Sequence, residues 1–184
     1  MGIKIFNLKP TVTAFAAIVM FSLPAMAQDA DLLLEKLKTA PEAEAGRLEQ
    51  EIETAWSKSG SAAMDLLLKR GREALEADDQ QAAIEHLSAL TDHAPEFAEG
   101  WHARATAYYR AGLYGPALDD LQRALALNPD NFNAIFGLGV MMQEFDEPAR
   151  AEAAFRAVLA LHPHHENAKS ALEQLKSSGI GRTL

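Results

Sequence analysis

Residues 98–130 read AEGWHARATAYYRAGLYGPALDDLQRALALNPD, and this stretch decides the fold. It predicts two helices, with Gly112 at the turn between them and Pro129 after the second. The same residue types recur 34 residues before and after it, without an insertion. Four columns keep this spacing: Gly71, Ala105 and Gly139; Ala83, Ala117 and Ala151; Leu87, Leu121 and Phe155; Pro95, Pro129 and Pro163. The sequence therefore predicts three stacked copies of one helix–turn–helix unit.

Each column has a mechanical interpretation. We expect the small residues where the two helices of a unit approach most closely, because a larger side chain would push the helices apart. The large apolar residues should fill the space between adjacent units. A proline cannot continue the second helix and so sets the step to the next unit.

The signature resembles the tetratricopeptide repeat family, and the resemblance extends from Met64 to about Lys176. The residues that carry it in the middle unit are Trp101, Ala105, Tyr108, Ala117, Leu121, Ala124 and Pro129. The resemblance implies an all-α, right-handed α-solenoid of three helix–turn–helix repeats at 64–97, 98–131 and 132–165. Proteins of this family typically bind peptides or partner proteins along a concave groove formed by the first helix of each repeat.

The segments on either side of the repeats depart from the signature. Residues 28–60 contain two short helical stretches, and we expect this N-terminal helical pair to cap the exposed edge of the first repeat. Dimerisation through the pair is the alternative. Residues 166–176 have a polar face and predict a C-terminal capping helix, as an exposed end of an array requires. Residues 177–184 are expected to form a flexible tail.

The first 27 residues have the pattern of a secretory signal peptide. Lys4 and Lys9 precede an apolar run of twelve residues, and Ala25-Met26-Ala27 forms a small-residue cleavage site. The run is shorter than the roughly 20 residues that span a bilayer. We therefore expect cleavage after Ala27 and a periplasmic protein without a membrane anchor, with release to the extracellular medium as the alternative.

Composition excludes several functional classes. The chain has no cysteine, so it contains no disulfide, thiolate metal site or cysteine nucleophile. Its formal net charge of −9 argues against a nucleic-acid surface and against attraction to anionic lipids. Gly137-Leu138-Gly139 lies within a predicted helix, where it indicates packing and not a nucleotide site. We expect neither catalysis nor a cofactor.

The resemblance also implies which side chains face the groove. These are the second, fifth, ninth, twelfth and thirteenth places of the first helix in each repeat. Leu68, Tyr109, Phe136 and Val140 would form an apolar centre within a rim of mixed charge. The candidate binding residues are Leu68, Arg72, His102, Thr106, Tyr109, Arg110, Phe136, Val140 and Gln143.

This pattern suits an extended or helical peptide with one or two hydrophobic anchors. The lysine and asparagine set with which some family members clamp a terminal carboxylate is absent, although Arg72 and Arg110 could meet an acidic group. The alternative function is an assembly or maturation factor of a cell-envelope complex, such as cytochrome maturation, outer-membrane or cell-wall machinery. The sequence does not determine the oligomeric state.

The run His162-Pro163-His164-His165 is the best candidate for a metal site, because imidazoles bind zinc and copper. No thiol or acid at ligand spacing completes a closed site. We favour a polar loop between repeats in which the histidines flank the required proline. A metal-binding protein is therefore the least favoured alternative, and no residue is assigned as a metal ligand.

Overall fold

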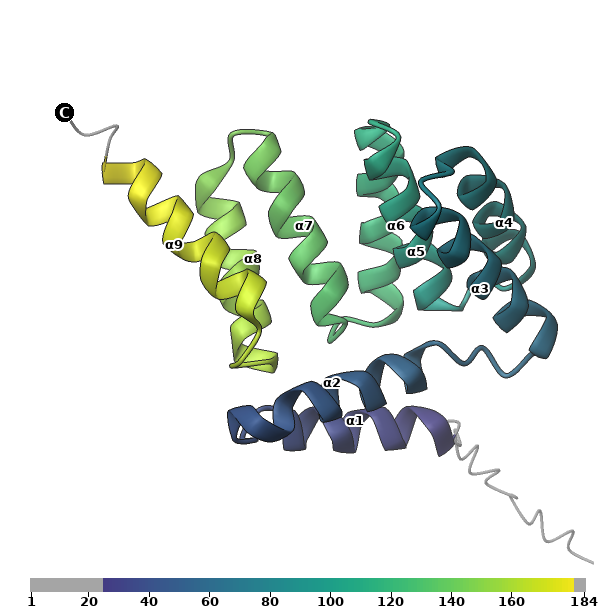
Figure 1. Cartoon of the computed structure of the whole chain (residues 1–184), viewed down its shortest axis with the longest axis horizontal. Helices are drawn as coiled ribbons and strands as arrows, with labels where there is room; N and C mark the ends of the chain where they lie inside the picture. The colour runs from purple at the N-terminus through teal and green to yellow at the C-terminus, as the bar shows by residue number, and fades with distance from the viewer. Residues whose placement is uncertain (1–24, 181–184) are drawn as a thin grey trace, which may run out of the picture.

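The computed structural model describes residues 25–180, and this part of the chain is helical between its turns. The helices are α1 (Ala25–Leu37), α2 (Glu42–Trp56), α3 (Ala62–Glu76), α4 (Gln80–His93), α5 (Ala98–Arg110), α6 (Tyr114–Leu127), α7 (Phe132–Glu144), α8 (Pro148–Leu161) and α9 (Glu166–Ile180). The pairs α3–α4, α5–α6 and α7–α8 are the three predicted repeats, which follow one another as a solenoid (Figure 1). The predicted all-α repeat architecture is confirmed.

The ends of the chain differ in detail from the expected boundaries. The expected signal peptide falls mainly on residues 1–24, which lie outside the described residues, and α1 begins at Ala25. At the other end, α9 continues through residues 177–180, which were expected to belong to a tail; residues 181–184 lie outside the described part. No helix found between residues 25 and 180 combines the length and apolar character needed to cross a membrane.

The turns inside the three repeats have the same backbone conformation. Asp78, Gly112 and Asp146 lie 34 residues apart and have φ values of 58°, 73° and 56°. In each turn the next residue donates its N–H to the carbonyl five positions earlier, at 2.9 Å. This is the helix end that a residue in the left-handed region produces. Glycine adopts that conformation most easily and aspartate tolerates it, so different residue types occupy one structural position.

The small residues on the first helix of each repeat face the large residues on the second. A Cβ placed on Gly71 would lie 2.4 Å from Leu87 Cγ, and one on Gly139 would lie 2.5 Å from Phe155 Cε1. The predicted close approach within repeats is thus confirmed. Leu87 and Phe155 pack against the first helix of their own repeat, whereas the sequence pattern predicts them between adjacent units. Leu121 also reaches the next repeat, 3.5 Å from the corresponding position on Gly137.

We expect Gly139→Ala to lower the free energy of unfolding, because overpacking costs about 1–3 kcal/mol and helix propensity returns only about 1 kcal/mol. The same change in a Phe155→Leu background should cost less, since Ala105 and Leu121 occupy the equivalent places in the second repeat. Urea denaturation of the unmodified protein, the two single variants and the double variant measures the coupling between positions 139 and 155. Gly46→Ala, on an open face of α2, is the control and should stabilise. Equal effects of Gly139→Ala in both backgrounds would contradict the packing argument.

The N-terminal hairpin α1–α2 does not cap the first repeat, so that prediction is wrong. The hairpin lies along the edge of the array where α6 meets α7 and α8 meets α9 (Figure 1). Its contacts reach the third repeat: the Trp56 and Phe132 ring centroids are 5.1 Å apart, and Asn133 Nδ2 donates to Glu53 Oε1 at 2.6 Å. The linker after α2 contains Gly60 at φ 83°, which allows the chain to reverse toward α3.

Burial explains this placement. Leu48 and Ile52 of α2 are buried in one large core with side chains of the second and third repeats and of α9. The first repeat has a separate, smaller core that includes Leu68 and Leu87. Leu66 on α3 stays 46% exposed, so the outer edge of the first repeat is left open to solvent. The apolar stripe of α2 is covered by the other end of the array instead.

Candidate functional site

A hollow of about 430 Å³ lies between α5 and α7, the first helices of the second and third repeats. Leu121 and Met141 are buried beneath it, and Gly137 contributes no side chain, which leaves space. Six of the nine candidate residues line this hollow: His102, Thr106, Tyr109, Arg110, Phe136 and Val140. The structure thus brings most of the predicted groove residues together around one apolar depression.

The other three candidates lie elsewhere. Leu68 is 2% exposed and belongs to the core of the first repeat, so its assignment to the groove surface is wrong. Arg72 lines a neighbouring hollow, where its guanidinium is held by other side chains. Gln143 is exposed and lies outside the lining of the apolar hollow.

Phe136 also has a structural role. Its ring centroid lies 5.5 Å from that of Phe155 and 5.2 Å from that of His165, so it packs between α8 and the start of α9. Tyr109 stacks instead on the exposed ring of Tyr114, and its hydroxyl donates to Glu144 Oε1 at 3.4 Å. Burial, followed by the nearby charge of Glu144, raises the pKa of Tyr109. Tyr109 is therefore the better candidate for a ligand contact.

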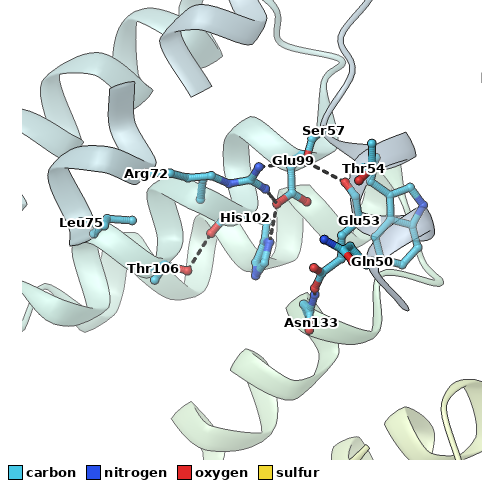
Figure 2. A pocket seen from close by; sticks show the side chains of 12 residues that line it. Gln50, Glu53, Thr54, Ser57, Arg72, Leu75, Glu99, His102, Thr106 and Asn133 are labelled. Carbon is cyan, nitrogen blue, oxygen red and sulfur yellow. Dashed lines mark hydrogen bonds and ion pairs between the residues drawn. The ribbon is translucent and has the colours of Figure 1, made fainter. Parts of the chain in front are cut away.

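A second, polar hollow of about 610 Å³ continues from the first and is closed on one side by α2 (Figure 2). His102, Thr106 and Asn133 line both hollows. The C-terminal half of α2, including Glu53 and Trp56, contributes the opposite wall together with Ser57, which follows the helix. The N-terminal hairpin thus forms one boundary of the groove, which no feature of the sequence had indicated.

The buried carboxylate of Glu99 organises the polar hollow. Arg72 Nη2 donates to Glu99 Oε1 at 2.5 Å, and His102 Nδ1 lies 3.2 Å from the same oxygen. Asn131 Nδ2 donates to Oε2 at 3.2 Å. Burial alone would raise the pKa of Glu99, but His102 and Arg72 outweigh it and hold this pKa below its ordinary value. One carboxylate therefore connects α3, α5 and the start of α7.

The two arginines proposed to meet an acidic ligand are already engaged within the chain. Arg72 Nη1 donates to Ser57 Oγ at 2.8 Å, in addition to its ion pair with Glu99. Arg110 Nη1 donates to the carbonyl oxygen of Leu75 at 2.8 Å. Each guanidinium therefore already donates to an acceptor within the chain, which a ligand carboxylate would have to share. An acidic ligand would therefore compete with these internal acceptors.

Three exposed apolar side chains extend the hollow onto the edge of the array, and we name Leu113, Tyr114 and Phe145 the aromatic edge. They are 46%, 41% and 42% exposed. The Tyr109 and Tyr114 ring centroids are 5.6 Å apart, and those of Tyr114 and Phe145 are 6.2 Å apart. Leu113 and Phe145 come from the turns of two repeats and Tyr114 begins α6, so only the 34-residue alignment of the turns could have suggested that they meet.

The histidines of the α8–α9 turn dock the hairpin. His162 is 2% exposed and its Nε2 lies 3.3 Å from Glu49 Oε2, while His164 Nε2 lies 3.0 Å from the carbonyl oxygen of Ala40. His165 is also buried, and its Nδ1 accepts the N–H of Ala168 at 3.1 Å. Within residues 25–180, no three side chains of metal-binding type are grouped as a metal site. The histidines lie in the turn between α8 and α9, and two of them, His162 and His165, are buried.

His165 caps α9 as Asn131 caps α7, one repeat earlier; Asn131 Oδ1 accepts the N–H of Ala134 at 3.0 Å. The cap requires an unprotonated Nδ1. Burial, reinforced by His162, lowers the pKa of His165, whereas Glu49 and Glu166 act in the opposite direction. The folded state therefore binds this proton less readily than the unfolded chain.

We expect acid to destabilise the C-terminal end through His165. Its lowered pKa means that stability falls as pH drops through the ordinary histidine value toward the folded value, by at most about 1.4 kcal/mol per pH unit. His165→Asn, which keeps an acceptor without a titratable ring, should flatten this dependence. Thermal unfolding between pH 7.5 and 5.5, with both proteins side by side, measures the difference. Parallel profiles for the two proteins would refute the role of the cap.

Comparison with known proteins agrees with this geometry. Residues 98–131 match the family model described as Tetratricopeptide repeat. A TPR repeat-containing protein of Rhizobium etli is 27% identical over 155 residues, which cover 84% of this chain and 76% of that protein. Residues 98–131 thus form a tetratricopeptide repeat, and most of the chain is similar to a protein that contains such repeats.

Two solved structures show the same fold. The first tetratricopeptide repeat domain of Spaghetti (RPAP3), bound to the HSP90 peptide SRMEEVD, superposes with a TM-score of 0.62 at 22% identity, covering 65% of this chain and 98% of that one. The MamA protein superposes with a TM-score of 0.58 at 21% identity, covering 83% of this chain and 81% of that one. At these identities the likeness establishes the fold alone.

Proposed function

We propose that this chain is a protein-interaction module that holds a peptide or a segment of a partner protein in the hollow between α5 and α7. The observation that carries the proposal is the convergence of six candidate residues, from two repeats, around one apolar depression. Preformed helices lose little entropy on binding, so anchors buried against Tyr109 and Val140 would contribute most of the affinity. Binding, and not catalysis, is the proposed activity.

The comparison with Spaghetti supports the class of ligand. That domain, of the same fold, is bound to a short peptide. Its peptide ends in an acidic sequence, whereas Arg72 and Arg110 of this chain already donate to internal acceptors. We therefore transfer the class of ligand, a short peptide, but not the identity of the peptide.

We further propose that the module acts in the periplasm after removal of residues 1–27. The argument is the charged, apolar and small-residue order of that segment. Removal takes away two lysines and no acid, so the net charge becomes −11. Amino-terminal sequencing of the protein from a periplasmic fraction should begin at Gln28; an intact Met1 in a cytoplasmic fraction would refute this location.

In-cell crosslinking tests the groove. A photoreactive residue at Thr106 should give a discrete adduct with one partner, and the same residue at the exposed Gln122 on α6 should not. Val140→Asp, which places a charge in the apolar hollow, should reduce the Thr106 adduct roughly tenfold, by about 1.4 kcal/mol, while far-ultraviolet circular dichroism stays unchanged. Equal adducts from Thr106 and Gln122, or an adduct indifferent to Val140→Asp, would refute the groove assignment. Mass spectrometry of the adduct identifies the partner and thereby tests the envelope-assembly alternative.

A further inference from the structure

The apolar surface does not end at the hollow. Tyr109 lines the hollow and stacks at an angle on Tyr114, which in turn meets Phe145 edge to face. The aromatic edge, Leu113, Tyr114 and Phe145, is more than two-fifths exposed at each residue. Large apolar side chains that gather on a surface mark interaction sites more often than single exposed ones do. The hollow and the aromatic edge therefore form one continuous surface.

The charges beside this surface are nearly all negative. The turns within the three repeats, aligned along one edge of the array, carry exposed carboxylates at Glu76, Asp78, Asp79, Glu144, Asp146 and Glu147. Two arginines accompany them. Arg110 donates to the carbonyl oxygen of Leu75, and Arg150 lies 3.8 Å from Glu147.

The polar hollow, at the other end of the groove, does not offset this excess of negative charge. Arg72, the only arginine or lysine lining the polar hollow, is paired with Glu99, and Glu53 lines the same hollow. A ligand carboxylate would meet the carboxylates of the turns at one end of the groove and, at the other end, the Arg72 guanidinium, which is already paired with Glu99. A ligand ammonium or guanidinium would be attracted to Glu144 and Glu147, and it could also stack on Tyr114 or Phe145.

We propose that the segment bound here is cationic and amphipathic: apolar side chains occupy the hollow and cover the aromatic edge, and lysine or arginine side chains between them face Glu144 and Glu147. This inference rests on the proposed function and specifies its ligand. An acidic segment is the opposite prediction from the same groove. The two differ in charge alone, so charge is the variable to test.

Three synthetic peptides of one length separate the possibilities. All carry the same leucine and phenylalanine anchors, and they differ in having lysine, glutamine or glutamate at the intervening positions. Fluorescence anisotropy with the purified chain should rank the lysine peptide tightest and the glutamate peptide weakest. The lysine advantage should shrink as sodium chloride is raised, because exposed charges are screened within about 10 Å at 0.1 M salt.

Matched variants locate the effect. Glu144→Lys with Glu147→Lys should weaken the lysine peptide roughly tenfold, since several exposed charge pairs each contribute a fraction of a kcal/mol. Glu42→Lys with Glu44→Lys, on the exposed first turn of α2, makes the same change in net charge and should have a much smaller effect. Tyr114→Ser with Phe145→Ser should weaken all three peptides, because it removes apolar contact and leaves the folded core intact.

Several results would overturn the inference. These are equal binding of the lysine and glutamine peptides, preference for the glutamate peptide, equal effects of the two charge reversals, or no binding of any peptide. In each of these cases the proposed function still stands if the photoreactive residue at Thr106 captures a partner and Val140→Asp reduces that adduct. If Val140→Asp leaves both the adduct and the peptides unaffected, the groove itself is wrong and the proposed function fails as well.

Discussion

Replacing Phe132 with alanine is expected to lower the free energy of unfolding by about 3–5 kcal/mol and to release the N-terminal hairpin. Phe132 is fully buried at the first position of α7. Its ring meets Trp56 of α2, and it lies 5.4 Å from the His162 ring and 6.3 Å from the His165 ring. One side chain thus joins the hairpin, the third repeat and the α8–α9 turn, and its loss leaves a cavity where these three meet.

Two measurements separate general loss of stability from release of the hairpin. Urea denaturation gives the change in unfolding free energy, and hydrogen exchange of the α2 amides reports local opening. Amides of α2 should exchange faster than those of α3 and α4, whose core is separate from that of Phe132. Phe145→Ala removes the same ring from a half-exposed position and should change stability by no more than about 0.5 kcal/mol. Unchanged exchange in α2 would show that the hairpin is held by other contacts.

Replacing Glu99 with alanine is the second large effect that we expect. The change removes the acceptor shared by Arg72, His102 and Asn131. Breaking a buried ion pair costs roughly 3–5 kcal/mol, and the loss should lie at the lower end because the Arg72 side chain is 40% exposed. The groove should also lose its fixed shape, since the first helices of all three repeats contribute to this network.

Glu96→Ala is the matched control. Glu96 also pairs with an arginine, Arg123, at 2.9 Å, but its side chain is 78% exposed. Exposed pairs contribute about 0–1 kcal/mol, so this change should be nearly silent. The pH dependence adds a test: the lowered pKa of Glu99 means that its contribution is present above the ordinary carboxyl value and is lost as pH falls through the folded value. Similar losses for Glu96→Ala and Glu99→Ala would contradict the organising role of Glu99.

The sequence predicted most of the groove residues correctly because local helix geometry determines which side chains share a face. The place of a residue along a helix determines which face it occupies, so His102, Thr106 and Tyr109 could be assigned to one face without coordinates. The same reasoning placed Leu68 on the groove, where it is buried, because the chain outside a repeat decides what covers that face. Phe136 shows the intermediate case, with one side in the hollow and the other against Phe155 and His165.

The contacts that sequence reasoning missed join residues far apart in the chain. Glu99 pairs with partners 27 and 32 positions away, and His162 meets Glu49 across 113 positions. No periodic pattern marks these pairs, because each occurs once. The aromatic edge was missed for a related reason: Tyr114 begins α6 and Phe145 lies in the turn after α7, and the repeat signature constrains neither side chain.

By itself, the sequence determined the helical fold, the 34-residue repeat, the close packing of Gly71 and Gly139, and most of the groove face. These features depend on interactions within one repeat or between neighbours, and such interactions leave a period in the residues. Only the tertiary structure decided where the hairpin docks, which arginines are occupied and that the groove is bounded by α2. Those outcomes depend on which apolar and charged surfaces meet when the N-terminal hairpin docks on the third repeat, and the spacing of residues along the chain does not encode that meeting.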